Sequence, residues 1–111
     1  MIGIDLISAE RMAVFHQRWG MRGLRRVFTA GELAVLDSAN GYERLAARFA
    51  AKEALIKALG HRIDFRKIEI FGGGRLRPEL RWLENNQWRR AAVSLTHHEG
   101  MCAAVCLLTD V

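Results

Sequence analysis

The sequence has few of the features that mark cross-linked, membrane-spanning or linker-rich proteins. Its 111 residues include two cysteines and one proline. No apolar run approaches the roughly 20 residues of a membrane-spanning helix, and no basic start leads into a signal-peptide core. We find no repeat, low-complexity tract or linker. Half of the residues are hydrophobic, which is enough for one modest core, so we expect a single domain over residues 1–111 in the cytoplasm.

The two cysteines, Cys102 and Cys106, fall in one expected strand. Four residues of a strand span about 13 Å, which is too long for a disulfide between them. We therefore expect two buried or half-buried thiols without a cross-link.

The chain has fewer acidic than basic residues. It contains 12 aspartates and glutamates and 17 lysines and arginines, which gives a net charge of +5. Part of this excess gathers near the start of the chain, at Arg11, Arg18, Arg22, Arg25 and Arg26. Ser8 can cap a helix that runs to about Arg18. The apolar side of this helix is predicted to carry Met12, Phe15 and Trp19.

An exposed basic surface of this kind attracts polyanions in general. A nucleic-acid-binding domain is therefore one open interpretation. The sequence shows neither a zinc-ligand spacing nor interleaved aromatic residues, so nucleic acid is not the partner that we expect.

The remaining pattern is typical of an α+β fold. Thr29 and Glu32 form a capping box for a short helix, and a longer helix is expected from about Tyr42 to Leu59. Strands are predicted at residues 67–71, 80–83, 91–96 and 101–109. Turns are predicted at Gly72-Gly73-Gly74 and at Asn85-Asn86. The last two strands form a hairpin, which places His97 at a strand end.

The segment from Arg48 to Gly60 places charged side chains where a buried helix side should be apolar. Its residues are good helix formers, and Gly60 is the expected stop. At 3.6 residues per turn, Glu53 and Lys57 lie on the side that carries Phe49. One interpretation is an ordinary surface pair of Glu53 with Lys57, worth a few tenths of a kcal/mol. The other is a catalytic pair.

A second carboxylate, Asp5, lies inside the apolar run at residues 1–7. Alternation along a strand places Asp5 on the face of Gly3 and Ile7, opposite to Ile2, Ile4 and Leu6. A buried acid needs a partner, which is either a lysine or arginine, or a divalent cation shared with Glu53. Two carboxylates together with phosphate oxygens and water suit Mg²⁺. The residues alone leave both interpretations open.

Four segments resemble the small single-domain holo-acyl-carrier-protein synthases, a type of 4′-phosphopantetheinyl transferase. They are Gly3-Ile4-Asp5, Arg26 to Leu33, Arg48 to Gly60, and Val93 to His97. The third resembles the family's Phe-Ala-x-Lys-Glu-Ala signature. The resemblance implies a small antiparallel sheet packed with a long central helix. It also implies a homotrimer that binds coenzyme A between neighbouring subunits.

The reaction that the resemblance implies transfers the 4′-phosphopantetheine group of coenzyme A to a serine of an apo acyl carrier protein. It depends on Mg²⁺ and releases 3′,5′-ADP. By resemblance, Asp5 and Glu53 hold the metal, and Glu53 and Lys57 are catalytic, with either Glu53 or a metal-polarised water as the base. The residues expected at coenzyme A are Arg48, Phe49, Lys52, Lys57, Gly60 and His97. Those expected at the carrier protein are Arg11, Arg18 and Arg22.

The chain departs from the family after Gly60, where His61-Arg62-Ile63 replaces the usual Thr-Gly and a longer loop. We therefore expect the loop beside the nucleotide to be rebuilt. A non-catalytic carrier-protein-binding module with the same fold is a further interpretation. The presence of Asp5, Glu53 and Lys57 argues against it.

Overall fold

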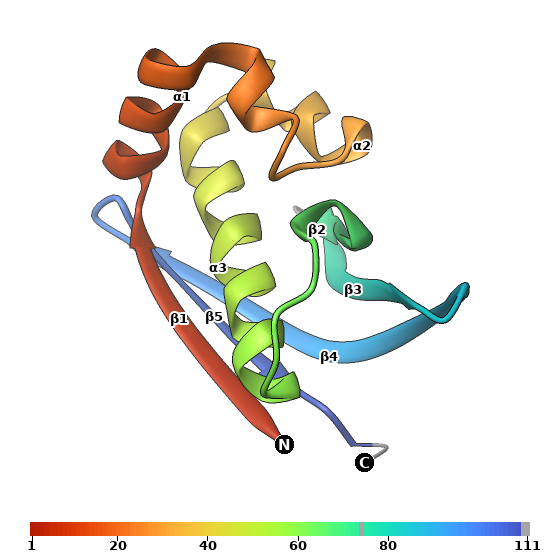
Figure 1. The fold of residues 1–111 in the computed structure, drawn as a ribbon. Coiled ribbons are helices and arrows are strands. Elements are labelled where there is room, and N and C mark those ends of the chain that lie inside the picture. Colours follow the sequence, from red (N-terminus) through yellow and green to blue (C-terminus); the bar gives the residue numbers. More distant parts are fainter. Residues whose placement is uncertain (74, 110–111) are drawn as a thin grey trace.

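The computed structural model describes residues 1–73 and 75–109 and arranges them as one five-stranded antiparallel sheet with three α-helices (Figure 1). The first half contains β1 (Ile2–Ser8), α1 (Ala9–Leu24), α2 (Ala30–Leu33), the 3₁₀ turn η1 (Ala34–Asp37) and α3 (Gly41–Leu59). The second half contains the 3₁₀ turn η2 (Phe65–Lys67), β2 (Ile68–Gly73), β3 (Leu76–Glu84), β4 (Gln87–His98) and β5 (Met101–Leu107). The third glycine of the predicted turn, Gly74, lies outside the described residues.

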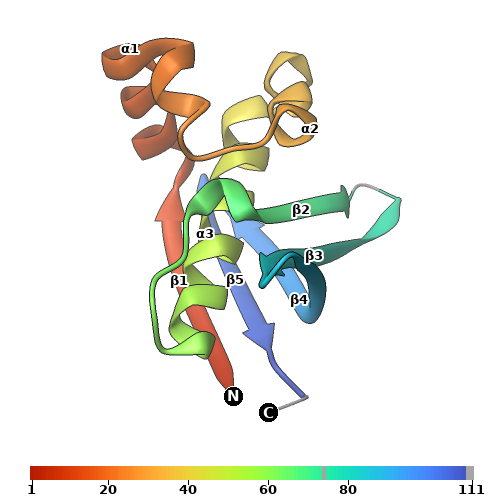
Figure 2. The same ribbon diagram turned by 45° about the vertical axis from the view of Figure 1, so that its right-hand side comes forward.

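The strands follow the order β1-β5-β4-β3-β2. β4 is long enough to pair with β3 through its first half and with β5 through its second. Figure 2 shows that β2 and β3 run in a direction strongly rotated from that of β1 and β5. β4 therefore joins two differently oriented halves, one of which packs against α3.

The helix expected from about Tyr42 to Leu59 is α3, and Gly60 ends it in the left-handed conformation with φ of 80°. Small buried residues allow it to approach the sheet closely; they include Ala46, Ala50, Ala51, Ala54 and Ala58. The closest approach is at Gly3, where an added Cβ would lie 1.9 Å from the Ala54 carbonyl oxygen. Only glycine fits there, so β1 carries Asp5 directly past α3.

The predicted alternation of β1 is confirmed. Gly3 and Ile7 are buried against the helix, whereas Ile2, Ile4 and Leu6 are more than 60% exposed on the other face. This outer face continues onto β5, because Ile2 pairs with Leu107 and Ser8 pairs with Met101. Met101 and Leu107 are exposed as well. The described part of the chain thus leaves one face of the β1–β5 pair apolar and uncovered.

The first helix differs from its prediction. Ser8 caps it as expected, but α1 continues past Arg18 to Leu24 through a non-helical Gly20 with φ of 65°. Met12 is buried, whereas Trp19 is 57% exposed. The expected apolar side therefore ends before Trp19, and the helix is kinked one residue later, at Gly20.

Two smaller predictions also changed. The strand expected at residues 80–83 is the longer β3, and the one expected at 91–96 is the longer β4. Cys102 and Cys106 are buried and free, as predicted, and burial raises the pKa of Cys106 to about 11. No helix in the described ranges is both long and apolar enough to span a membrane.

Candidate active site

Lys57 connects α3 to the strand that passes beneath it. Its Nζ donates hydrogen bonds to the Ile4 carbonyl at 2.9 Å and to Asp5 Oδ1 at 3.1 Å. The Asp5 side chain is 18% exposed and that of Lys57 is 54% exposed. The carboxylate therefore faces α3 at the edge of solvent, and a lysine, one of the two alternatives left open by the sequence, is its partner.

Glu53 lies one helical turn before Lys57 but pairs with a different cation. Arg62 Nη1 is 3.4 Å from Glu53 Oε1, and the Glu53 side chain is 18% exposed. Among the described residues, Glu53 and Lys57 therefore do not form the surface ion pair that was one interpretation of the sequence. Each carboxylate instead has its own cation from a neighbouring segment.

Asp5 and Glu53 suit Mg²⁺ only if other ligands complete its coordination shell. No group of three or more histidine, cysteine or acidic side chains in residues 1–73 and 75–109 could hold a metal. Asp5 and Glu53 come from β1 and α3, which pack directly on each other, and both are partly open to solvent. Mg²⁺ is commonly held by one or two carboxylates, with phosphate oxygens and water completing its shell. The pair thus suits a metal that arrives with a phosphate ligand.

A second group of predicted residues lies nearer the start of α3. Arg48 and His97 line one hollow of about 420 Å³, together with Asn40, Glu43, Arg44 and Leu76. His97 Nδ1 lies 2.6 Å from Glu43 Oε1. Glu43 precedes Glu53 by ten residues, which is about 15 Å along a helix. Within one chain, His97 is therefore held away from the Glu53 site.

Arg48 provides an electrostatic reason for an anion to enter this hollow. Its guanidinium donates to the Arg44 and Gly72 carbonyls, but its buried Nε has no hydrogen-bond partner among the described residues. Burial lowers the pKa of Arg48, and the nearby Arg44 cation lowers it further. Arg48 and Arg44 both line this hollow, so two cations would attract an anion there.

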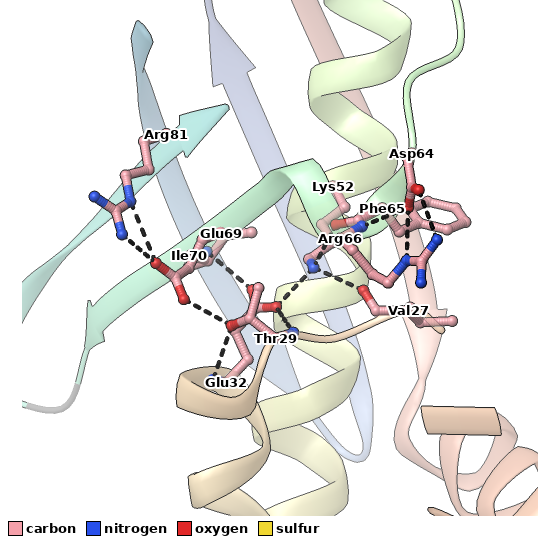
Figure 3. A network of polar contacts seen from close by, with 10 residues as sticks. All are labelled: Val27, Thr29, Glu32, Lys52, Asp64, Phe65, Arg66, Glu69, Ile70 and Arg81. Atoms are coloured by element: carbon pink, nitrogen blue, oxygen red, sulfur yellow. Dashed lines mark hydrogen bonds and ion pairs between the residues drawn. The ribbon is translucent and has the colours of Figure 1, made fainter. Parts of the chain in front are cut away.

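Lys52 has a different environment from the one expected. Its side chain is fully buried, and Nζ contacts Glu32 Oε1 at 2.6 Å and the Val27 and Phe65 carbonyls at 2.7 and 2.9 Å (Figure 3). Burial lowers the pKa of Lys52, and the Glu32 carboxylate opposes that shift. All three ammonium hydrogens have internal partners. The predicted contact of Lys52 with coenzyme A is thus not supported by this geometry.

The other two predicted pocket residues lie apart from each other. Phe49 packs on Phe65 with ring centroids 5.5 Å apart, and it lines a hollow of about 200 Å³ that Arg11 also borders. Gly60 lies at the end of α3, just before Arg62. Phe49 therefore lies beside the basic surface, and Gly60 beside the Glu53 site.

The predicted docking arginines Arg11, Arg18 and Arg22 are all exposed on α1. Arg22 borders a hollow of about 600 Å³ with Phe15, Trp19, Gly23 and Arg26. The Arg18 guanidinium lies 5.3 Å from the Trp19 ring centroid. The surface thus combines positive charge with exposed aromatic area.

Sequence reasoning missed two contributors, Glu43 and Arg62. Glu43 is separated from His97 by more than fifty residues, and no spacing rule joins a helix start to a strand end. Arg62 is closer to Glu53, but the chain reverses at Gly60 between them. The presence of a left-handed stop at Gly60 was the one available signal that the next residues fold back along α3.

Comparison with known proteins identifies the family. The family model of the 4′-phosphopantetheinyl transferase superfamily matches residues 1–106. The chain therefore belongs to this superfamily, as the resemblance predicted. A holo-[acyl-carrier-protein] synthase from Carboxydothermus hydrogenoformans is 35% identical over 117 residues, covering 96% of this chain and 94% of that protein. One from Koribacter versatilis is 37% identical over 123 residues, covering 97% and 96%.

Solved structures agree with this assignment. The crystal structure of Helicobacter pylori holo-[acyl-carrier-protein] synthase in complex with coenzyme A has a TM-score of 0.84 and 27% identity, covering 98% of this chain and all of that one. The enzyme from Neisseria meningitidis has a TM-score of 0.80 and 30% identity, covering 95% and 94%. The enzyme class of the chain within the superfamily is thus holo-[acyl-carrier-protein] synthase.

Proposed function

We propose that the chain transfers the phosphopantetheine group of coenzyme A to a serine of an apo acyl carrier protein. The serine oxygen forms a bond to the phosphorus that bears pantetheine, and the bond from that phosphorus to the bridging diphosphate oxygen breaks. The products are the phosphopantetheinyl serine, 3′,5′-ADP and the hydroxyl proton. We further propose that residues 1–111 act as one domain in the cytoplasm.

The observation that carries this proposal is the ion pair of Lys57 with Asp5 across the contact of β1 with α3, together with Glu53 one turn earlier on the same helix. Lys57 extends one turn beyond Glu53 and is the cation that offsets charge on the diphosphate. Asp5 and Glu53 would hold Mg²⁺, which when bound neutralises phosphate charge and polarises water. Either Glu53 or a water polarised by the metal is proposed to accept the serine proton.

The hollow with Arg48 and His97 is proposed for the phosphates of coenzyme A. It is lined by the Arg48 and Arg44 side chains and by the exposed His97 ring. These groups favour a phosphate because charged donors make the strongest hydrogen bonds to anions. Because the hollow is removed from Glu53 along α3, one molecule of coenzyme A would use Glu53 of one subunit and His97 of a neighbour.

A homotrimer is the assembly that we propose for this sharing. Its support is the outer sheet face of Ile2, Ile4, Leu6, Met101 and Leu107, which is apolar and uncovered. Exposed apolar surface of this kind is typical of a subunit interface. A rotationally symmetric assembly buries the same face of every copy and can bring each α3 beside the next subunit's β4.

The carrier protein is proposed to dock on α1. Arg11, Arg18 and Arg22 supply positive charge for an acidic partner, and Trp19 with Phe15 supplies an apolar centre. Charge complementarity of this type raises the rate of encounter, whereas the aromatic centre provides contact area.

The test is intact mass spectrometry of an apo acyl carrier protein incubated with the chain and coenzyme A. We expect a phosphopantetheine mass increase with Mg²⁺, no increase with chelator, and none with a folded Glu53→Gln variant. No increase with any of several carriers would instead support a binding module. A polyanion binder would tolerate chelator and lose affinity steeply with salt.

A further inference from the structure

Lys52 is the only fully buried lysine among the described residues, and it lies next to Glu53 on α3. Its ammonium contacts the α1–α2 connection at Val27, the adjacent α2 at Glu32 and, much later in the chain, η2 at Phe65 (Figure 3). It also lies 5.4 Å from the Phe28 ring centroid. A single side chain therefore joins both flanks of the helix that carries Glu53.

Glu32 is fully satisfied in this arrangement. Its Oε1 accepts from the Thr29 backbone N–H at 2.9 Å and pairs with Lys52, and its Oε2 accepts from the Ile70 N–H at 2.9 Å. Thr29 in turn donates to Glu69 at 2.7 Å. The buried charge pair is thus part of a network that fixes the α1–α2 connection against β2.

Stability alone is a poor explanation for such a pair. Desolvation of two buried charges is costly, and well-packed apolar residues of similar size often serve a fold equally well. What apolar residues cannot supply is the directional contact to two particular carbonyls. Val27 directly follows the basic docking surface that ends at Arg26, and Phe65 ends the loop that carries Arg62 to Glu53.

This inference rests on the proposed function. We infer that Lys52 is a positioning residue that fixes the position of the α1 docking surface relative to Glu53. A carrier protein docked on α1 must deliver its serine to a fixed point beside Glu53. Small misplacements of reacting groups cost large factors in rate. Lys52 fixes this geometry because it binds the connection after α1 and the loop after α3 from one position on α3 itself.

The test uses the double variant Lys52→Met/Glu32→Gln, which removes both charges together and leaves no unpaired buried ion. Folding is checked by circular dichroism and thermal melting. Coenzyme A binding is measured by calorimetry with Mg²⁺, and kcat and KM are measured for an apo acyl carrier protein. The matched control is Asp64→Asn/Arg66→Gln, which removes the exposed ion pair of 2.9 Å on either side of Phe65. Arg22→Glu serves as the docking control.

We expect the double variant to bind coenzyme A within about twofold of the parent, while kcat/KM for the carrier falls at least about tenfold. The Asp64→Asn/Arg66→Gln control should leave both the coenzyme A affinity and the carrier kcat/KM unchanged. Unchanged carrier kinetics in the folded double variant would overturn the inference. Weaker coenzyme A binding with an unchanged carrier KM would overturn it too, and would restore Lys52 as a coenzyme A contact.

A second variant covers a failure to fold. Lys52→Gln/Glu32→Gln keeps amide donors for the buried carbonyls and also leaves no unpaired buried ion, and we expect it to retain more carrier kcat/KM than Lys52→Met/Glu32→Gln. Unfolding of both variants at 25 °C would assign Lys52 to stability and overturn the positioning role. Failure of the proposed function is distinguishable from these outcomes, because the unmodified chain would then transfer to no carrier at all.

Discussion

Lys57 and Asp5 form an ion pair of 3.1 Å that joins the middle of the chain to its first strand. The same ammonium donates to the Ile4 carbonyl at 2.9 Å. The pair fixes the relative position of a carboxylate and a cation across the contact of β1 with α3. It also holds the Lys57 ammonium beside Asp5, so a phosphate bound next to Asp5 could contact this cation.

Replacement of Lys57 by Gln tests this placement. We expect phosphopantetheine transfer to fall about 10²–10³-fold, as for loss of one charge-stabilising donor at a reacting group. The free energy of unfolding should change by less than about 1 kcal/mol, because the lysine of the pair is 54% exposed. Single-turnover transfer and urea unfolding measure the two quantities. Transfer at the parent rate would remove Lys57 from the mechanism.

Arg62 pairs with Glu53, the carboxylate that we propose as a metal ligand. The Arg62→Gln variant should bind Mn²⁺ more tightly, by roughly twofold to fivefold, since an exposed ion pair contributes up to about 1 kcal/mol. Electron paramagnetic resonance of free Mn²⁺ measures the affinity directly, in the presence of 3′,5′-ADP. Arg66→Gln is the control, because Arg66 pairs with Asp64 in the same loop. Equal affinities in the two variants would argue against competition by Arg62.

Mixing two inactive variants tests whether subunits share a site. Glu53→Gln and His97→Ala should each lose most transfer when pure. In randomly mixed trimers, one site in each hybrid would combine an intact Glu53 with an intact His97. Mixing one-to-one should then restore about a quarter of the parent activity, as symmetric assembly requires. If size-exclusion chromatography shows that the mixed sample is trimeric but it remains inactive, Glu53 and His97 would belong to one subunit's site.

Gly3→Ala tests the close approach of β1 to α3. The added methyl group would meet backbone atoms, namely the Ala54 oxygen at 1.9 Å and the Ala58 nitrogen at 2.9 Å. Backbone cannot move aside as a side chain does, so we expect a loss of about 3 kcal/mol or more in the free energy of unfolding. Thermal melting should show a decrease of more than about 10 °C. Gly31→Ala, whose nearest contact is an ordinary 3.4 Å to Glu69, should melt near the parent temperature.

Glu69 makes the fold sensitive to acid. Burial raises the pKa of this carboxyl, but hydrogen bonds from Thr29 and Arg81 outweigh burial and lower it overall. A glutamate in the unfolded chain has a pKa of about 4.3. The stabilisation is therefore complete above that value and is lost as the pH falls through the lower folded-state pKa. Urea unfolding between pH 6 and pH 3 should show a smaller loss of stability for Glu69→Gln than for the parent or for the exposed Glu10→Gln.

The sequence by itself determined the features that depend on neighbours along the chain. The Ser8 and Thr29 caps, the alternation of β1 and the stop of α3 at Gly60 follow from local backbone preferences and periodicity. The family signature around Glu53 also lies within one helix. These signals were sufficient for the fold class and for the enzyme class.

The tertiary structure decided which charges meet and which are buried. Lys52 and Lys57 lie on the same helix, yet one is enclosed with Glu32 and the other faces Asp5. Likewise, Trp19 is exposed although it lies on the predicted apolar side of its helix, and His97 meets Glu43 because β4 ends beside the start of α3. Such contacts join segments that are distant in sequence, and their geometry depends on how the whole sheet packs against α3. Local propensity contains no information about that packing.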